Sequence, residues 1–286
     1  MSKARHPVFL AALWMLASIA SFSLIAVSAK ELSPGMQTAQ ILFFRSLIGL
    51  LIILAVVAVR GASRLTTRNL KQHVQRNLAH FLGQFGWIYG IAFLPLAEVF
   101  ALEFTVPVWT AIAAAVLLGE AISRARLVTI ILGLVGVVII LRPTQQVVHP
   151  AALVVLASAV AFGFSHTLTR ALVTEDSPLA VVFYMCLIQL PMAVVLSLPH
   201  WVMPASGTWP WLLVIALAAM SAHYCLSKAL AHADAMVVIP MDFLRLPFIM
   251  LVGWYFYNEA LDGLLLLGAL IMVAGNVFNL RQERRD

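Results

Sequence analysis

Charged residues are scarce in this chain. Asp, Glu, Lys and Arg make up 10% of its 286 residues, whereas hydrophobic residues make up 63%. In soluble domains about a quarter of the residues are charged. The shortage therefore excludes an ordinary soluble domain and indicates a protein that lies within a membrane.

The sequence also lacks the patterns on which catalytic and metal sites are usually built. Its two cysteines, Cys186 and Cys225, form no CxxC pair and lie inside apolar runs. Neither a disulfide framework nor a metal site is therefore expected. There is no HExxH, no phosphate-binding loop, and no Ser, His and acid grouping that spacing would unite. We expect no enzyme activity, no cofactor and no nucleic-acid partner, and a membrane-embedded enzyme is kept only as a remote alternative.

Long apolar runs fill most of the chain. A helix needs roughly 20 residues to cross a bilayer. Ten runs meet or approach this length, although the short third and fifth runs and the tight link at Pro95 also allow a count of eight or nine. We expect an all-α integral membrane protein with ten spans, at roughly 7–29, 37–59, 77–94, 97–118, 126–141, 150–172, 179–199, 209–230, 235–257 and 261–280.

The basic residues fall on one side of this arrangement. If the N-terminus is cytoplasmic, fourteen of the 18 Lys and Arg residues lie in cytoplasmic segments. Only Lys30 and Arg142 lie outside, and Arg45 and Arg245 lie within spans. Cytoplasmic loops of membrane proteins carry an excess of Lys and Arg. Both termini are therefore expected in the cytoplasm, and the net charge of +6 is a matter of topology.

The second half of the chain repeats the first. Residues 11–22 (AALWMLASIASF) recur as residues 151–162 (AALVVLASAVAF), with seven identical positions at a constant separation of 140 residues. Further matches are Lys30 with Arg170, Glu120 with Glu259, and Ser33-Pro34 with Ser177-Pro178 after a four-residue insertion, which pairs Arg45 with Gln189. Five spans per half is an odd number, so the halves enter the membrane from opposite sides, as in many secondary transporters. We expect repeats at 1–143 and 150–280, and a cytoplasmic tail at 281–286.

The order and spacing of several short motifs resemble a known family. They are an arginine in the second span, a proline-containing fourth span that ends in LLGE, a glycine-rich fifth span, and their counterparts in the second half (Arg45, Pro107, Gly119, Glu120, LGLVGVVIILRP, Pro247, Glu259, Gly275). In this the chain resembles EamA-type members of the drug/metabolite transporter superfamily. The resemblance implies a ten-helix carrier in the bacterial inner membrane for a small metabolite, often an exporter.

Two carboxylates lie deep within spans. Glu103 and Asp242 each precede the glutamate that ends their segment by seventeen residues, so inversion places both near the bilayer midplane. Ionisable groups at that depth are functional candidates by default. Proton coupling and binding of a substrate amine both suit them. Asp242 also has Arg245 one helical turn away, so a simple neutralised pair is the alternative there.

Other candidates for substrate binding are one cation, one histidine and four aromatics. Arg45 could hold a carboxylate or phosphate in a bidentate fork, or serve as a structural partner of Glu103 or of helix-end carbonyls. His166 could be a packing element or a proton carrier. The deep aromatics could stack on a substrate or pack against lipid (Trp14, Trp87, Tyr89, Trp109).

These features predict a secondary-active transporter that works by alternating access, with Glu103, Asp242, Arg45 and Arg245 at the repeat interface. The mixed charges favour a small polar metabolite such as an amino acid or a derivative, with export as the favoured direction. Vitamin uptake, for example of riboflavin, and drug efflux are the alternatives. The expected partners are the substrate and the bilayer; protons as coupling ion and a homodimer are both left open.

Overall fold

The computed structural model describes residues 5–61, 65–119, 124–142, 148–172, 175–232, 241–242 and 244–282. Within these ranges the regular secondary structure is helical, and two short 3₁₀ turns, η2 (Leu198–His200) and η3 (Ser206–Thr208), join α8 to α9. Helices suit long apolar runs because they satisfy their own backbone hydrogen bonds within the bilayer.

The helices of the first half are α1 (Arg5–Leu32), α2 (Thr38–Arg60), α3 (Leu70–Phe93), α4 (Leu96–Glu103), α5 (Val106–Leu118) and α6 (Arg124–Leu141). Those of the second half are α7 (Pro150–Leu172), α8 (Pro178–Ser197), α9 (Trp209–His232), α11 (Arg245–Tyr257) and α12 (Gly263–Gln282). Among the described residues, six segments are long and apolar enough to cross a membrane, one of them formed by α4 and α5 together, and α6 and α12 contain shorter apolar helices.

The two halves match helix by helix. α3 and α9 each have 24 residues and start 139 positions apart, and α5 and α11 each have 13 residues at the same separation. α5 and α11 also end alike, on left-handed residues, Gly119 with φ 68° and Asn258 with φ 53°. Such agreement in length and termination indicates an internal duplication.

The structure corrects one part of the sequence alignment. α1 and α7 end at Leu32 and Leu172, and α2 and α8 start at Thr38 and Pro178, so the separation stays at 140 and no insertion is needed. Ser33 lies in the turn after α1, whereas the Ser177 hydroxyl caps α8 by accepting a hydrogen bond from Ala180 N. By helix position Arg45 therefore corresponds to Met185, and its pairing with Gln189 was wrong.

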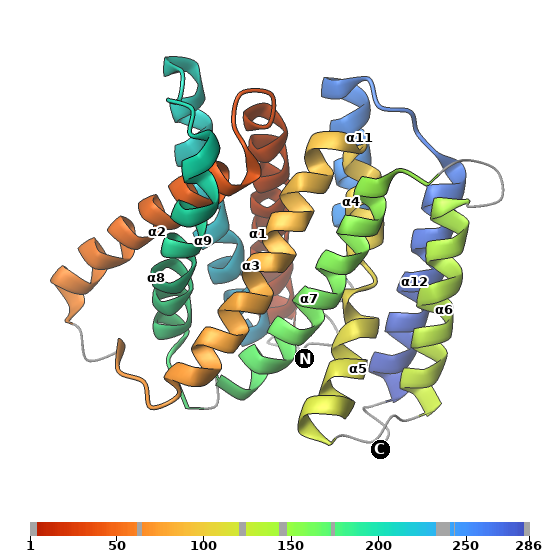
Figure 1. Ribbon diagram of the computed structural model, residues 1–286. Helices are drawn as coiled ribbons and strands as arrows, with labels where there is room; N and C mark the ends of the chain where they lie inside the picture. Colours follow the sequence, from red (N-terminus) through yellow and green to blue (C-terminus); the bar gives the residue numbers. More distant parts are fainter. Residues whose placement is uncertain are drawn as a thin grey trace.

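Equivalent helices run in opposite directions. In Figure 1, α1 rises from the end marked N, whereas α7 descends toward the same end. α6 and α12 are related in the same way, and α12 finishes near the start of α1 at the lower end of the molecule. α1 of the first half packs against α9 of the second. Their equivalents, α7 and α3, pack against each other in the same way.

The fourth span is broken in the middle. α4 ends at Glu103, and α5 begins at Val106, with Pro107 in its first turn. Proline is tolerated there because its missing N–H has no partner in a first turn. The Thr105 hydroxyl donates to Leu102 O across the break. The single helix expected over 97–118 is thus two helices, and their junction places Glu103 inside the protein.

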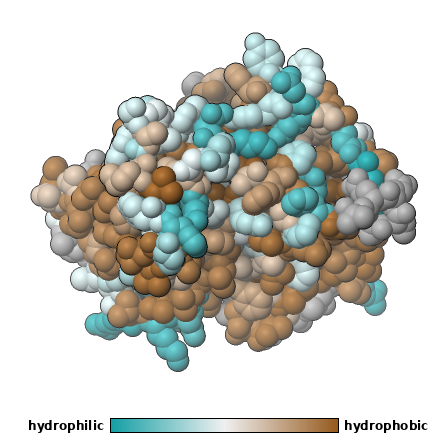
Figure 2. Space-filling view, turned by 45° about the horizontal axis from the view of Figure 1, so that its top comes forward, coloured by the Kyte–Doolittle hydropathy of each residue, from teal (hydrophilic) through white to brown (hydrophobic). Residues whose placement is uncertain are grey.

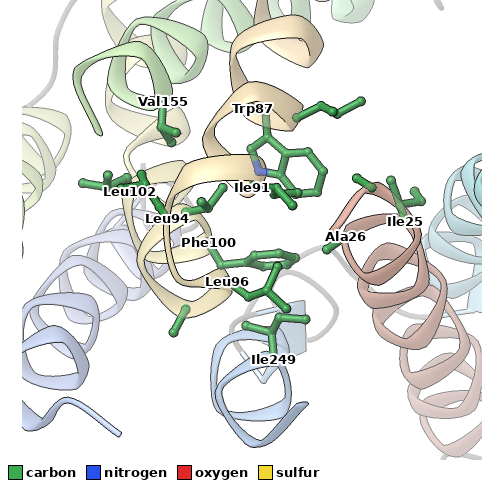
Figure 3. Close-up of a cluster of buried hydrophobic side chains, with 14 of the residues drawn as sticks. Ile25, Ala26, Trp87, Ile91, Leu94, Leu96, Phe100, Leu102, Val155 and Ile249 are labelled. Atoms are coloured by element: carbon green, nitrogen blue, oxygen red, sulfur yellow. The ribbon is translucent and has the colours of Figure 1, made fainter. Parts of the chain in front are cut away.

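The largest apolar core lies toward the upper end in Figure 1. It combines the later part of α1, the end of α3, all of α4 and parts of α7 and α11. Figure 3 shows Ile25, Trp87, Leu96, Phe100 and Ile249 converging there from four helices. Seen with that end turned forward, the surface carries hydrophilic residues across the upper part and a broad hydrophobic zone below them (Figure 2).

Toward the opposite end the described core divides into two smaller clusters. One joins α1 to α9 through Ala11, Met15, Ile19 and Ala229, and the other joins α2 to α8 through Ile53, Met185 and Cys186. The halves are thus sealed together by one continuous apolar core at the upper end and, over the described residues, by less at the lower end.

Candidate functional site

Arg245 is the buried centre of a charge cluster whose two carboxylates are partly exposed. Its Nη2 is 3.2 Å from Glu103 Oε1 and 3.5 Å from Asp242 Oδ2, and Arg245 itself is 5% exposed. Glu103 comes from the broken span of the first half, whereas Asp242 and Arg245 come from the equivalent segment of the second. The cluster therefore forms where the two halves meet, and it brings together three of the residues singled out in the sequence.

Aromatic rings surround this cluster. The Trp87 indole donates a 2.9 Å hydrogen bond to Glu103 Oε2. The Arg245 guanidinium lies 4.9 Å, 5.1 Å and 5.7 Å from the ring centroids of Phe22, Phe100 and Phe104. Cation–π contacts of this kind contribute about 2 kcal/mol when the cation is shielded from water. The rings thus stabilise the buried charge and give the site planar apolar walls.

Two polar atoms of the cluster are enclosed without a partner. Among the residues that the structure describes, Asp242 Oδ1 and Arg245 Nε make no hydrogen bond. Buried polar atoms are nearly always paired, so each such atom calls for an explanation. When all three groups are ionised, the charges +1, −1 and −1 sum to −1. The site is therefore suited to a cationic group or a proton.

An apolar cavity lies on the α1 side of Asp242. It measures about 150 Å³ and is lined by Ala12, Met15, Leu16, Ile19, Met241 and Leu244. Met241 and Leu244 flank Asp242 in sequence. An aliphatic part of a ligand could occupy this space while a polar part meets the carboxylate.

Arg45 lies apart from Glu103. It is 8% exposed and lines a small cavity between α2, α8 and α9, together with Ser46, Gly49, Cys186 and Gln189. Its charge acts on Arg76 of α3, which is equally buried at 5% exposure. No described carboxylate pairs with either arginine. The structural alternative, in which Arg45 is the partner of Glu103, is not seen.

A stripe of buried polar residues runs along α3 toward Trp87. Its members are spaced three or four residues apart, so they share one helix face (His73, Arg76, Asn77, His80, Gln84). Gln189 of α8 joins the stripe through Gln84, Asn77 and His80. At the lower end His73 Nε2 is 2.7 Å from Asp176 Oδ2, which also accepts a hydrogen bond from Thr67. The stripe explains why α3 begins at Leu70, earlier than the apolar run at 77–94 predicts.

His166 of α7 points into the bundle although its side chain is exposed. The preceding turn holds Phe162, which packs on Gly83 of α3, and Gly163, which packs on Trp109 of α5. A residue between these two faces is directed between α3 and α5. The charges of both Arg76 and Arg245 act on the His166 ring. His166 therefore lies on the side of α7 that faces α3 and α5.

The remaining predicted aromatics have separate surroundings. Trp14 packs edge-on against Tyr224 of α9, with ring centroids 6.0 Å apart. Tyr89 packs against Phe93 at 4.7 Å. The Trp109 indole donates to the Thr105 hydroxyl at the helix break. Over the described residues, Trp87 is the one of these four aromatics that donates a hydrogen bond to the charge cluster.

The upper end is closed by an ionic contact between the halves. Lys30 of α1 lies 2.9 Å from Glu259 and also donates to Leu94 O, while Glu259 accepts a hydrogen bond from Leu96 N. Nearby, Arg142 pairs with Asp262. We refer to Lys30 and Glu259, with the backbone of Leu94 and Leu96, as the upper latch. Glu120, the counterpart of Glu259, lies outside the described residues.

A helical membrane protein with a duplicated fold, a broken span and charged groups buried where the halves meet has the architecture of a secondary transporter. The match to protein families agrees. The chain belongs to the EamA-like transporter family, whose model matches twice, at residues 9–142 and 149–281. The protein is thus a multi-pass membrane transporter of the drug/metabolite transporter superfamily and not an enzyme.

Curated relatives of similar length carry different substrates. The chain is 26% identical over 273 residues to an S-adenosylmethionine uptake transporter of Rickettsia prowazekii, covering 96% of this chain and 93% of that one. It is 30% identical over 291 residues to a riboflavin transporter of Vibrio cholerae, covering 100% and 97%. It is 28% identical over 263 residues to the pseudopaline exporter CntI of Pseudomonas aeruginosa, covering 91% and 92%.

A solved crystal structure shares the fold. It matches with a TM-score of 0.66 over 96% of this chain and 98% of its own, at 18% sequence identity. At that level of identity the likeness concerns the fold alone.

Sequence reasoning missed the three phenylalanines around Arg245 and the polar stripe of α3. Nothing in the sequence distinguishes these three phenylalanines from the others among the 16 in the chain. The stripe did carry one, because polar residues at positions 73, 76, 77, 80 and 84 follow helical spacing in an otherwise apolar region.

Proposed function

We propose that this protein is a secondary-active carrier of a zwitterionic metabolite, an amino acid or a derivative of one. The observation that carries the proposal is the cluster of Arg245, Glu103 and Asp242. Aromatic rings surround the buried arginine, and one oxygen of Asp242 has no hydrogen-bond partner among the described residues. The unpaired Asp242 oxygen would receive the substrate ammonium group. Glu103 and Asp242 are also the residues through which protons would couple to transport.

The proposal includes a topology. Ten spans form two inverted repeats, at 1–143 and 150–280, with both termini and the tail 281–286 on the cytoplasmic side of the bacterial inner membrane. Opposite helix directions in the two halves support the inversion (Figure 1). The excess of Lys and Arg at the lower end supports the orientation.

Alternating access follows from the closed upper end. With the upper latch formed over a continuous apolar core, the upper end is closed, so we assign the structure to a cytoplasm-facing state. Opening the latch and closing the lower end would expose the same cluster to the other side. The named relatives include an uptake transporter as well as an exporter, so they favour neither direction of transport, and the proposal names none.

Riboflavin is the second candidate substrate. The relative at 30% identity across the whole chain is a riboflavin transporter. In this case Arg245 neutralises one of the two carboxylates, and Phe22, Phe100, Phe104 and Trp87 provide the walls for a planar ring.

The test is transport by purified protein in liposomes with an imposed pH gradient. Labelled S-adenosylmethionine, amino acids and riboflavin are offered to the parent and to Glu103→Gln and Asp242→Asn. Glu98→Gln, which removes a carboxylate in the first turn of the same helix α4, is the control. We expect gradient-driven flux of a zwitterion that both site variants lose and the control keeps. Riboflavin flux in its place supports the second candidate, and unchanged zwitterion flux in both site variants overturns the site assignment.

A further inference from the structure

Two arginines lie inside the protein without an acid partner. Arg45 of α2 is 8% exposed and Arg76 of α3 is 5% exposed. Within the described part of the chain, Arg45 makes no hydrogen bond or ion pair. The bonds that Arg76 makes go to neutral oxygens, from Nε to Thr169 Oγ1 at 3.0 Å and from Nη1 to Asn77 Oδ1 at 2.8 Å. Each guanidinium thus keeps donors that no carboxylate satisfies.

Their closeness makes the arrangement costly. The charge of Arg45 acts on Arg76, so the two guanidinium groups repel one another. A buried charge without an opposite charge strongly destabilises a fold, and charges within membrane spans are rare unless they serve a pathway. An anion between the two would remove the repulsion and satisfy the free N–H groups.

The surroundings are shaped for such a ligand. Arg45 lines a cavity of about 20 Å³, enough for a water-sized group such as one carboxylate oxygen. Gln189, which is 1% exposed, lines the same cavity and bonds to Gln84, Asn77 and His80 of α3. The α3 stripe therefore fixes a further polar side chain beside the guanidinium.

Neither arginine belongs to the repeated scaffold. By helix position Arg45 corresponds to Met185, and Arg76 of α3 corresponds to Ile215 of α9. A purely structural role in a duplicated fold would be expected in both halves. A pair of arginines in one half only indicates a task that the carrier performs once.

The pair also complements the central cluster. Arg245 is already engaged by two carboxylates, so it is poorly placed to hold a substrate carboxylate as well. The charges of both Arg76 and Arg245 act on His166 of α7, so the two groups flank the same part of this helix. One flank carries unpaired positive charge, and the other carries excess negative charge.

We infer that Arg45 and Arg76, together with Gln189, form an oxyanion subsite that binds the carboxylate of the transported solute. This inference rests on the proposed function and deepens it: Asp242 receives the ammonium group and the arginine pair receives the acid. A planar guanidinium binds a carboxylate through two parallel N–H bonds, which fixes the orientation of the solute as well as its charge.

The first experiment tests the subsite without transport. Thermal unfolding of detergent-purified parent, Arg45→Gln and Arg76→Gln is followed with acetate or inorganic phosphate against chloride at equal ionic strength. Arg68→Gln, which removes an exposed arginine before α3, is the control. We expect oxyanions to raise the midpoint of the parent and of the control, and to leave both site variants unchanged. Arg45→Lys, which keeps the charge and loses the fork, should respond weakly.

The second experiment compares two solutes that differ in one group. S-adenosylmethionine and its decarboxylated analogue compete for uptake into liposomes. The parent should prefer the carboxylated solute by at least about tenfold, the equivalent of one charge-assisted hydrogen bond. Arg45→Gln should lose that preference and still carry the analogue, whereas Arg68→Gln should keep it.

The outcomes separate this inference from the proposed function. If oxyanions stabilise the parent through Arg45 but no zwitterion is carried, the subsite stands and the proposed function fails. If a zwitterion is carried and Arg45→Gln leaves the solute preference unchanged, the subsite is overturned. Stabilisation by phosphatidylglycerol vesicles alone, with no response to soluble oxyanions, assigns the arginines to a lipid headgroup and also overturns it.

Discussion

At the scale of single residues, Trp87 fixes the orientation of Glu103. Its indole donates to Oε2, which leaves Oε1 for Arg245. Trp87→Phe keeps the ring and removes one hydrogen bond to a charged acceptor, a loss of about 1.5–3 kcal/mol. We expect the apparent affinity for the transported solute to fall about tenfold, measured from the concentration dependence of uptake into liposomes.

Trp109 of α5 provides a matched control for Trp87 of α3. The Trp109 indole donates to the Thr105 hydroxyl, a neutral acceptor. Trp109→Phe should therefore reduce the affinity clearly less than Trp87→Phe. Equal effects from the two substitutions would show that the aromatic volume matters and the bond to Glu103 does not.

The charged part of the site could be predicted from the sequence, because its members are conspicuous. Glu103, Asp242 and Arg245 are ionisable residues in apolar runs, and the repeat marks the two acids as equivalents. The contact of Arg245 with Glu103 could not be predicted, since it depends on how the halves meet. The pairing of Arg45 with Gln189 was wrong because a short Ser-Pro match outweighed the constant spacing of the helices.

At the scale of helices, Gly163 sets how closely α7 approaches α5. A Cβ on Gly163 would lie 2.7 Å from Trp109 C and 2.8 Å from Thr110 N. Backbone atoms cannot move aside as a side chain can. Gly163→Ala should therefore destabilise the protein by about 1–3 kcal/mol, in line with overpacked cores. Thermal unfolding in detergent measures this loss.

Gly35 provides the comparison. It lies in the turn after α1, and a Cβ there would meet nothing within 4 Å. Gly35→Ala should leave the unfolding midpoint unchanged or slightly raised, because the unfolded chain loses freedom. A loss as large as that of Gly163→Ala would contradict the close-packing explanation.

A second prediction at this scale concerns the start of α12. Asp262 Oδ1 accepts hydrogen bonds from Leu264 N and Leu265 N, and Asp262 also pairs with Arg142. Burial by itself raises the pKa of Asp262, but the bonds from Arg142 and the two N–H groups outweigh it and lower the pKa below its ordinary value. Asp262→Ala should cost about 0.5–2 kcal/mol of stability, as for other helix caps.

The pH dependence of this contribution has a definite sign. A carboxyl whose pKa is lowered by folding stabilises the protein above its unfolded pKa, and the gain is lost as pH falls through the folded value. The difference in unfolding midpoint between parent and Asp262→Ala should therefore be full at neutral pH and shrink on acidification below about pH 4. A difference that stays constant into acid would contradict the charged cap.

The existence of most helices follows from the sequence, since their apolar runs have the length of a bilayer. The break of the fourth span at Glu103 could not be predicted from the sequence. Pro107 alone is compatible with a kink in one long helix, whereas the observed break also needs the Thr105 contact and the packing of α4 against α11. The early start of α3 was missed for a related reason: its polar face is buried against α7 and α8, which only the assembled bundle shows.

At the scale of the whole molecule, the upper latch is the contact that must open in the proposed alternating-access cycle. Lys30 reaches across from the first half to Glu259 of the second, and both also hold the backbone between α3 and α4. Glu259→Gln removes the charge and keeps the shape of the side chain. It should weaken the latch and shift the population toward the state that is open at the upper end.

Cysteine labelling measures this shift. In a background with Cys186→Ala and Cys225→Ala, an Ala29→Cys probe lies one residue before Lys30 at a position that is 0% exposed. A membrane-impermeant maleimide added to right-side-out vesicles should label the probe several-fold faster in Glu259→Gln than with the latch intact. Glu31→Gln, which alters an exposed neighbour bonded to Tyr257, is the control and should label slowly.

Equal slow rates in all variants would show that the apolar core closes this end without the latch. Labelling from inside-out vesicles only would reverse the proposed orientation, because it would place the Lys30 end in the cytoplasm.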